Sequence, residues 1–352
     1  MENTNKKSKK KSIIYLVLFL ISIGVLVYFC ISDNNLLTLF NVLPSLNFKW
    51  IFVSILAMVV YWFLDSRVIY HLTLDTCSKK YSILESFSIS MIGQYFNSIT
   101  PYNIGGQPMQ IICMTKQGID AGLACSVFIR KFLIYQVSLT FCSVVVVITR
   151  FNSFRQQIPD FMNITLIGFL SQAIVVTILI LISVSKTVTD RIMDLIKKVL
   201  PKLKFIKNPD QIIDNTQKQF DSYIENNKAM NKKLKLTIYM YLLTLLELIS
   251  LFLVPLFVYK AFNNEGFPIF DILSAQIFVT TISSCMPLPG GTGMSEGSFF
   301  ILFSLFFSKE IISSAMLIWR FITYYLNIIV GSIFSLIFNK ISSKKVNQNQ
   351  KI

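Results

Sequence analysis

Several stretches of this sequence are long and apolar enough to cross a lipid bilayer as helices. The stretch 13–31 holds fourteen Leu, Ile, Val or Phe residues and no charge, and the ~30 Å of bilayer hydrocarbon requires about 20 such residues. Backbone groups inside lipid must be paired within their own segment, so these stretches have to be helical. We predict an all-α polytopic membrane protein with about six full spans, at 13–31, 50–70, 121–149, 161–183, 234–258 and 311–338.

The composition excludes a soluble globular domain. Hydrophobic residues make up 53% of the chain and charged residues 14%, whereas an average soluble domain is about 25% charged. His71 is the only histidine and no CxxC pair occurs, so the usual zinc-binding patterns are missing. A P-loop motif is missing as well. We therefore expect no catalytic residue, no metal and no cofactor.

The net charge of +15 indicates membrane topology and not nucleic-acid binding. Five lysines precede the first apolar stretch and four follow the last one. The segment 186–235 carries twelve basic and six acidic residues, and basic connections stay in the cytoplasm. We predict that both termini and this segment are cytoplasmic. The first part of the segment is either an interfacial amphipathic helix or a solvated helical linker.

Two further apolar regions, 84–119 and 272–307, are interrupted in the middle. Proline and paired glycines stand at 100–108 and at 287–293, and they free backbone groups that lipid cannot pair. Neither half of either region is long enough to cross the bilayer comfortably. We predict two oppositely oriented re-entrant helical hairpins that point at each other.

The predicted elements form an inverted repeat. Each half reads as span, span, broken hairpin, span, and in such a repeat the binding site is expected near the bilayer midplane, where the broken helices meet. We expect a basic cytoplasmic tail at 1–12, a first membrane repeat at 13–150, a second at 161–340 that contains the loop 186–235, and a cytoplasmic tail at 341–352.

The breaks carry two glycine pairs, Gly105 with Gly106 and Gly290 with Gly291, and Gln107 follows the first pair. A helix that begins inside the membrane presents free N–H groups and the positive end of its dipole, which suits a phosphate or carboxylate. The alternative is that the glycines only let helices pack closely. The opposed orientation of the breaks favours the binding hypothesis.

Each break is followed by an arginine inside an apolar stretch, Arg130 and Arg320. A charge at the bilayer centre is costly, so such side chains face protein, water or the membrane surface. Arg320 is the better candidate for binding an anion. Arg130 is equally compatible with an anion site and with a place near the cytoplasmic surface, where we expect Lys131 to reach.

Two carboxylates stand in or beside the predicted spans. Glu247 lies in the middle of 234–258 and requires a partner, a proton or water there. A structural ion pair with an arginine and a substrate or proton site are equally compatible with this position. Glu296 opens the half-helix after the second break, where a local helix cap is favoured over recognition of a lipid amine.

The sequence Pro-Leu-Pro-Gly-Gly-Thr-Gly-Met-Ser-Glu-Gly at 287–297 resembles the P-G-G-x-G-x-x-E signature of the lysylphosphatidylglycerol synthase transmembrane family. The first break at 100–108, with Arg130 downstream, resembles another signature of that family. Gln107 departs from it, because many members carry an acidic residue there. The resemblance covers nearly the whole chain. It implies the flippase-like membrane region of multiple peptide resistance factor proteins, without the cytosolic lysyltransferase domain.

The resemblance and the broken helices together predict a lipid translocase. The substrate would be an anionic or aminoacylated phospholipid such as phosphatidylglycerol or lysyl-phosphatidylglycerol. Arg130 and Arg320 would hold the phosphate, the glycine pairs would let backbone N–H groups approach it, and Glu247 or Glu296 would take an amine or a proton. The alternatives are a phosphatidylglycerol lysyltransferase with a lysyl-tRNA donor and a carrier of a small soluble solute. We expect lipid headgroups, the bilayer and a separate lipid-modifying synthase as partners, and nucleic acid only for the lysyltransferase.

Overall fold

The computed structural model describes residues 40–77, 81–158, 233–284 and 288–349, with scattered positions between 168 and 217. All the elements in this part of the chain are helical. The helices are α3 (Phe48–Thr76), α4 (Ile83–Ile99), α5 (Gly106–Lys116), α6 (Ala121–Gln157), α10 (Leu234–Ala261), α11 (Ile269–Ser283), α12 (Met294–Phe303), α13 (Ile312–Arg320) and α14 (Leu326–Asn349). Short 3-10 turns lie at η2 (Leu43–Ser45), η3 (Pro101–Asn103) and η5 (Pro289–Gly291), and a π-helical turn lies at η6 (Phe321–Tyr325).

Four helical stretches of the described residues are long and apolar enough to cross a membrane. They are Phe48–Thr76, Ala121–Gln157, Leu234–Ala261 and the continuous helix Ile312–Phe338. Each coincides with a span predicted from the sequence, and the chain is an all-α membrane protein. The predicted span at 13–31, the tail at 1–12 and most of 161–183 and 186–235 lie outside the described residues.

Helix α6 is longer than the predicted span, which was expected to end at residue 149. It continues to Gln157 because its last turns pack against α11. The Arg150 Nε atom lies 2.8 Å from Asp271 Oδ1, and the buried Phe154 ring meets Phe278 edge to face at 5.5 Å. These contacts supply polar and apolar partners for a segment whose own sequence is too polar to predict a span.

The long helices have apolar outer surfaces and polar residues inside. The exposed side chains include Phe52, Phe63, Phe141, Leu242 and Ile333. The buried side chains include Asp65, Arg130, Glu247, Glu296 and Arg320, all of which are 4% exposed or less. A soluble protein places these two classes the other way round. Lipid requires apolar side chains on its contact surface, and it leaves charged groups only the helix-packed interior.

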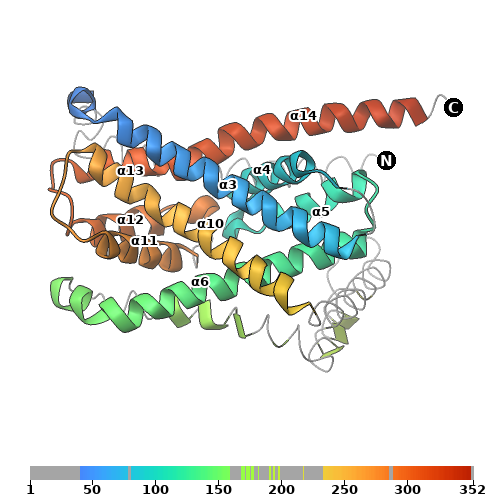
Figure 1. Ribbon diagram of the computed structural model, residues 1–352, viewed down its shortest axis with the longest axis horizontal. Coiled ribbons are helices and arrows are strands. Elements are labelled where there is room, and N and C mark those ends of the chain that lie inside the picture. Colours follow the sequence, from blue (N-terminus) through green and yellow to red (C-terminus); the bar gives the residue numbers. More distant parts are fainter. Residues whose placement is uncertain are drawn as a thin grey trace.

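Helices α3 and α10 form an antiparallel pair along most of their length (Figure 1). At one end the Asn47 N–H donates to the Ala261 carbonyl at 2.8 Å. At the other end Lys233 Nζ lies 2.5 Å from Asp75 Oδ1. Between them Ser54 Oγ donates to the Val254 carbonyl at 3.2 Å. The second predicted span of each half therefore packs on its counterpart in the opposite direction.

The first break separates α4 from α5. A capping box starts α4, with the Ser82 hydroxyl bound to the Glu85 N–H and the Glu85 carboxylate bound to the Ser82 N–H. The helix ends before Pro101, whose ring is incompatible with a helix interior. Tyr102 and Asn103 then adopt left-handed backbone angles, with φ of 54° and 55°. These angles turn the chain so that α5 packs back against α4.

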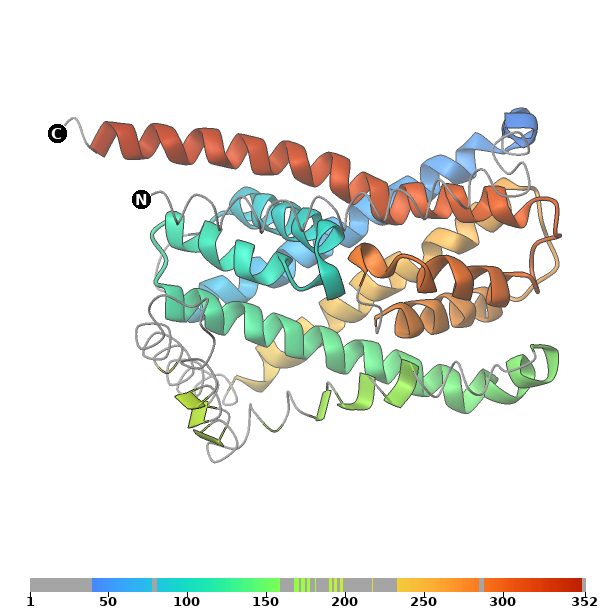
Figure 2. The ribbon, with the colours of Figure 1, turned by 180° about the vertical axis from the view of Figure 1, so that it is seen from behind.

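The second break separates α11 from α12 in a similar way. The described residues resume at Leu288 after a gap at 285–287, and the turn η5 leads into α12. The two helix pairs approach each other from opposite ends of the molecule (Figure 2), with α4 and α5 in teal and α11 and α12 in orange. Their breaks meet in the middle, because η3 and α4 both contact η5.

Candidate functional site

The second break is built around Gly290, whose backbone has φ of +62°. This left-handed conformation favours glycine, and an added Cβ would also overlap the Tyr324 ring. Downstream, the Glu296 carboxylate accepts a hydrogen bond of 2.6 Å from the Gly293 N–H and caps the start of α12. The expectation that Glu296 acts as a local helix cap is confirmed.

Arg320 lies at the end of α13 and fixes the second break. Its Nε atom is 2.6 Å from Glu296 Oε1, and its Nη1 and Nη2 atoms each donate to the Gly290 carbonyl at 3.1 Å. The guanidinium carbon also lies 4.9 Å from the centre of the Tyr324 ring. The side chains of Arg320 and Glu296 are only 5% and 1% exposed. The sequence singled out both residues but did not predict that they pair.

One hydrogen bond joins the two breaks, and a second joins η6 to α4. The Gly290 N–H donates to Asn103 Oδ1 at 3.1 Å, and the Tyr324 hydroxyl donates to the Ser98 carbonyl at 3.0 Å. The expected meeting of the two broken regions is thereby confirmed for the described residues. Asn103, Tyr324 and Ser98 were not singled out from the sequence, since each supplies a common polar group whose partner lies in the other half of the chain.

The glycines of the first break use their amides within the hairpin. The Gly105 N–H donates to Thr100 Oγ1 and the Gly106 N–H to Asn97 Oδ1, both at 2.9 Å. A Cβ on Gly106 would lie 2.6 Å from the Gly93 carbonyl oxygen. Close packing, one of the two alternatives left open by the sequence, therefore accounts for this pair.

Gly291 is similarly enclosed. Its N–H donates to the Leu288 carbonyl at 3.0 Å, and a Cβ there would lie 2.9 Å from the Ser283 carbonyl oxygen. Both glycine pairs thus have their N–H groups bound to protein in this conformation. The polar groups that converge at the junction of the breaks belong instead to Arg320, Glu296, Asn103 and Tyr324.

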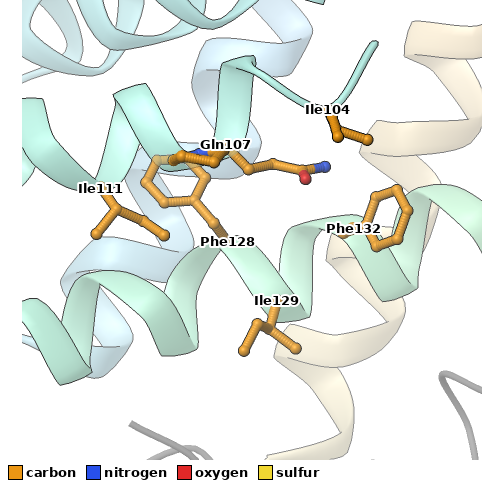
Figure 3. Close-up of a pocket in the computed structure, with 7 residues that line it drawn as sticks. Ile104, Gln107, Ile111, Phe128, Ile129 and Phe132 are labelled. Atoms are coloured by element: carbon orange, nitrogen blue, oxygen red, sulfur yellow. The ribbon is translucent and has the colours of Figure 1, made fainter. Parts of the chain in front are cut away.

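A groove of about 340 Å³ opens beside the first break, between α5 and α6 (Figure 3). The Gln107 side chain extends into it, and its amide lies between Ile104 and Phe132. The other lining side chains are apolar, so the groove offers a hydrophobic surface with one amide. Its lining residues are Ile104, Gln107, Pro108, Ile111, Phe128, Ile129 and Phe132.

Arg130 has partners different from those of Arg320. Its Nη1 atom lies 3.7 Å from Asp75 Oδ2 and 3.2 Å from Thr76 Oγ1, at the end of α3. Lys233 pairs with the same Asp75 carboxylate. The structure therefore does not bring Arg130 to the groups that surround Arg320.

Outside the long apolar helices, the loop after α3 contains Cys77. Burial raises the pKa of the Cys77 thiol above its ordinary value, and the negative charge of Asp120 raises it further. The adjacent Tyr81 hydroxyl donates to Gln117 Oε1 at 3.1 Å. A thiol with a raised pKa stays protonated and unreactive near neutral pH.

A second buried polar cluster joins α3, α4, α6 and α10. Lys131 Nζ lies 2.5 Å from Asp65 Oδ1, and the Ser90 hydroxyl donates to the other Asp65 oxygen. Glu247 faces the same carboxylate and is 1% exposed. Lys131 was expected at the membrane surface, but the ion pair with Asp65 holds it inside.

Asp65 could have been singled out from the sequence, because an aspartate inside a predicted span requires a partner. An ion pair between Glu247 and an arginine does not fit the described residues, since the charged neighbours of Glu247 are Asp65 and Lys131. No group of three or more His, Cys, Asp or Glu side chains in the described ranges is arranged to hold a metal ion.

Comparison with known proteins identifies the family. The sequence matches the family described as Lysylphosphatidylglycerol synthase TM region over residues 13–331. A UPF0104 membrane protein of Archaeoglobus fulgidus is 24% identical over 309 residues, 87% of this chain and 91% of that protein. An uncharacterized MG306 homolog of Mycoplasma pneumoniae is 24% identical over 350 residues, 91% of this chain and 86% of its own length. The family match includes both breaks and Arg320, and the chain belongs to the lysylphosphatidylglycerol synthase TM region family.

Proposed function

We propose that this protein is a translocase that moves an anionic or aminoacylated phospholipid, such as phosphatidylglycerol or lysyl-phosphatidylglycerol, between the leaflets of a bacterial cell membrane. One observation carries the proposal: two helix breaks from opposite ends of the molecule meet at a buried arginine, Arg320. Membership in a family whose description names a lysylphosphatidylglycerol synthase supports the lipid class.

The chemistry of Arg320 suits a phosphodiester. A guanidinium has five N–H donors, and the contacts of Arg320 with the described residues use three of them, on Glu296 and Gly290. One N–H group on Nη1 and one on Nη2 are left, and because they point to different sides of the guanidinium plane, each would donate to a separate anionic oxygen. The Glu296 carboxylate balances the arginine charge while no headgroup is bound. The same carboxylate would attract the amine of an aminoacylated lipid.

The groove beside the first break supports the path of the lipid tails. Its apolar lining between α5 and α6 matches an acyl chain, and Gln107 offers an amide at the level of the break. The headgroup would pass along the junction of the breaks while the tails stay in the bilayer. Gln107 would contact the polar part of the lipid that lies between the headgroup and the chains.

The membrane topology belongs to the same proposal. Six spans, two re-entrant hairpins and cytoplasmic termini form an inverted repeat whose site lies near the midplane. The shared order of elements in the two halves supports this repeat: a long helix, a helix, a turn, a short helix and a second long helix. The antiparallel packing of α3 on α10 is also the relation that an inverted repeat requires.

The proposal is tested with purified protein in liposomes. Labelled phosphatidylglycerol or lysyl-phosphatidylglycerol should become accessible to an impermeant quencher at a rate that depends on the protein. Arg320→Met should remove this activity, whereas Lys309→Met, which deletes an exposed cation, should not. Lysylated product from lysyl-tRNA would instead establish the lysyltransferase. Uptake of a soluble solute without lipid movement would establish a carrier.

A further inference from the structure

The buried cluster around Asp65 is separate from the junction of the breaks and is built by four helices. Asp65 comes from α3, Ser90 from α4, Lys131 from α6 and Glu247 from α10. Asp65 and Glu247 are 2% and 1% exposed, and the Lys131 side chain is 16% exposed. Titratable groups buried this deeply between membrane-crossing helices are costly to keep unless they carry a function.

The charges of the cluster do not balance if both carboxyl groups are ionised. Lys131 pairs with Asp65 at 2.5 Å, which neutralises one carboxylate. Glu247 has no salt bridge to any cation in the described ranges, and its charged neighbours are Asp65 and Lys131. One ammonium group balances one of the two buried carboxylates, so the cluster is neutral only when the other carboxyl group carries a proton.

Among the described residues, the titratable groups that interact with Glu247 agree with this reading. From α3 they are Asp65 and Tyr61, and from α6 they are Lys131 and Tyr135. Tyrosines are neutral at physiological pH, so Lys131 is the one cation among these neighbours. A neutral cluster consists of one ammonium, one carboxylate and one protonated carboxyl group.

We propose that Asp65 and Glu247 share one exchangeable proton and form a proton-binding site that couples lipid movement to a pH gradient. The proposal rests on the proposed translocase function and adds its energy source. Loading the proton neutralises the cluster, and releasing it leaves an uncompensated negative charge between α3, α6 and α10. The charged state favours a different helix packing that admits water, which is how a buried titratable pair drives a conformational change. Because α6 and α10 also contact the elements of the two hairpins, such a change reaches the breaks.

The test uses the full chain in liposomes with the membrane potential clamped. A gradient of about one pH unit corresponds to a factor of about ten per coupled proton. We expect the wild type to concentrate labelled phosphatidylglycerol up to about tenfold in one leaflet under this gradient. Glu247→Gln should equilibrate the lipid without concentrating it. Glu310→Gln, which removes an exposed carboxylate, should behave like the wild type.

Glu247→Gln is suited to this test because it keeps the shape and polarity of the side chain while Lys131 still balances Asp65. A second readout is the infrared C=O band of a protonated carboxyl group. At neutral pH this band should be present in the wild type and reduced in Glu247→Gln. Its absence from the wild type would overturn the shared proton.

Three transport results would contradict the coupling and leave the translocase intact. The first is lipid movement that is the same with and without the pH gradient. The second is that Glu247→Gln still concentrates the labelled lipid in one leaflet. The third is that a sodium gradient, in place of the proton gradient, concentrates the labelled lipid. A wild type that moves no phospholipid at all would instead overturn the proposed function and, with it, the coupling. The infrared band would then decide separately whether the cluster holds a proton.

Discussion

The pairing of Arg320 with Glu296 predicts a strong energetic coupling between two residues that are 24 positions apart. We consider Arg320→Met, Glu296→Gln and the double variant. Glutamine can still accept the Gly293 N–H bond, so the cap of α12 persists in Glu296→Gln. The bonds from Arg320 to the Gly290 carbonyl are lost equally in Arg320→Met and in the double variant. The cycle therefore isolates the ion pair itself.

The expected magnitude follows from burial. The side chains of Arg320 and Glu296 are 5% and 1% exposed, and Arg320 Nε lies 2.6 Å from Glu296 Oε1. Removing one partner of a buried pair leaves an uncompensated charge and costs about 3–5 kcal/mol of folding free energy. In the double variant no charge remains, so the second substitution costs much less than it does alone. We expect a coupling energy of about 2–3 kcal/mol, at the upper end for neighbouring residues.

The assay is unfolding in detergent micelles, followed by the fluorescence of the tryptophans, one of which is Trp319 next to the site. Each single variant should unfold at a much lower denaturant concentration than the wild type. The double variant should lose less free energy of unfolding than the sum of the two single losses. Additive losses, with a coupling below about 0.5 kcal/mol, would refute the reasoning. Such a result would mean that the arginine and the carboxylate do not depend on each other for charge balance.

Three further predictions concern the turn, the loop after α3 and the topology. Gly290→Ala should destabilise the fold by at least about 1–2 kcal/mol because φ is +62°, whereas Gly297→Ala, where a Cβ meets nothing within 4 Å, should be neutral or stabilising in the same unfolding assay. Maleimide labelling of Cys77 in the folded protein should be slow near neutral pH and should rise at a higher pH than in the denatured protein, because its pKa is raised; identical pH profiles would contradict this. A cysteine introduced at Asp210 should be protected from an impermeant reagent in intact cells, and labelling from outside would reverse the proposed topology.

Much of the fold could be predicted because lipid imposes a simple rule on sequence. Apolar length located the four described spans, and proline with glycine located both breaks, since these residues act on their own backbone. The end of α6 could not be predicted in this way. It depends on Arg150 and Phe154 finding partners on α11, more than a hundred positions later.

The sequence could predict individual residues of the candidate site but not which of them contact one another. Arg320 and Glu296 stood out because charges in apolar sequence need a reason. Their pairing depends on how α13 packs against α12, which a residue pattern does not encode. Asp65 carried the same signal as Glu247, but its role became visible only when Lys131 and Ser90 were found on neighbouring helices.

The hydrogen bonds at the junction of the breaks limit how early the junction can form while the chain is being synthesised. The partner of Asn103 is Gly290, which lies 187 residues further along the chain. The partner of Ser98 is Tyr324, which lies 226 residues further. At a synthesis rate of about 5–20 residues per second, Gly290 emerges about 10–40 s after Asn103. During that interval the first helix pair has no counterpart, so its turn must be held by water or by the insertion machinery. The junction of the breaks can therefore be complete only after both Gly290 and Tyr324 have been synthesised.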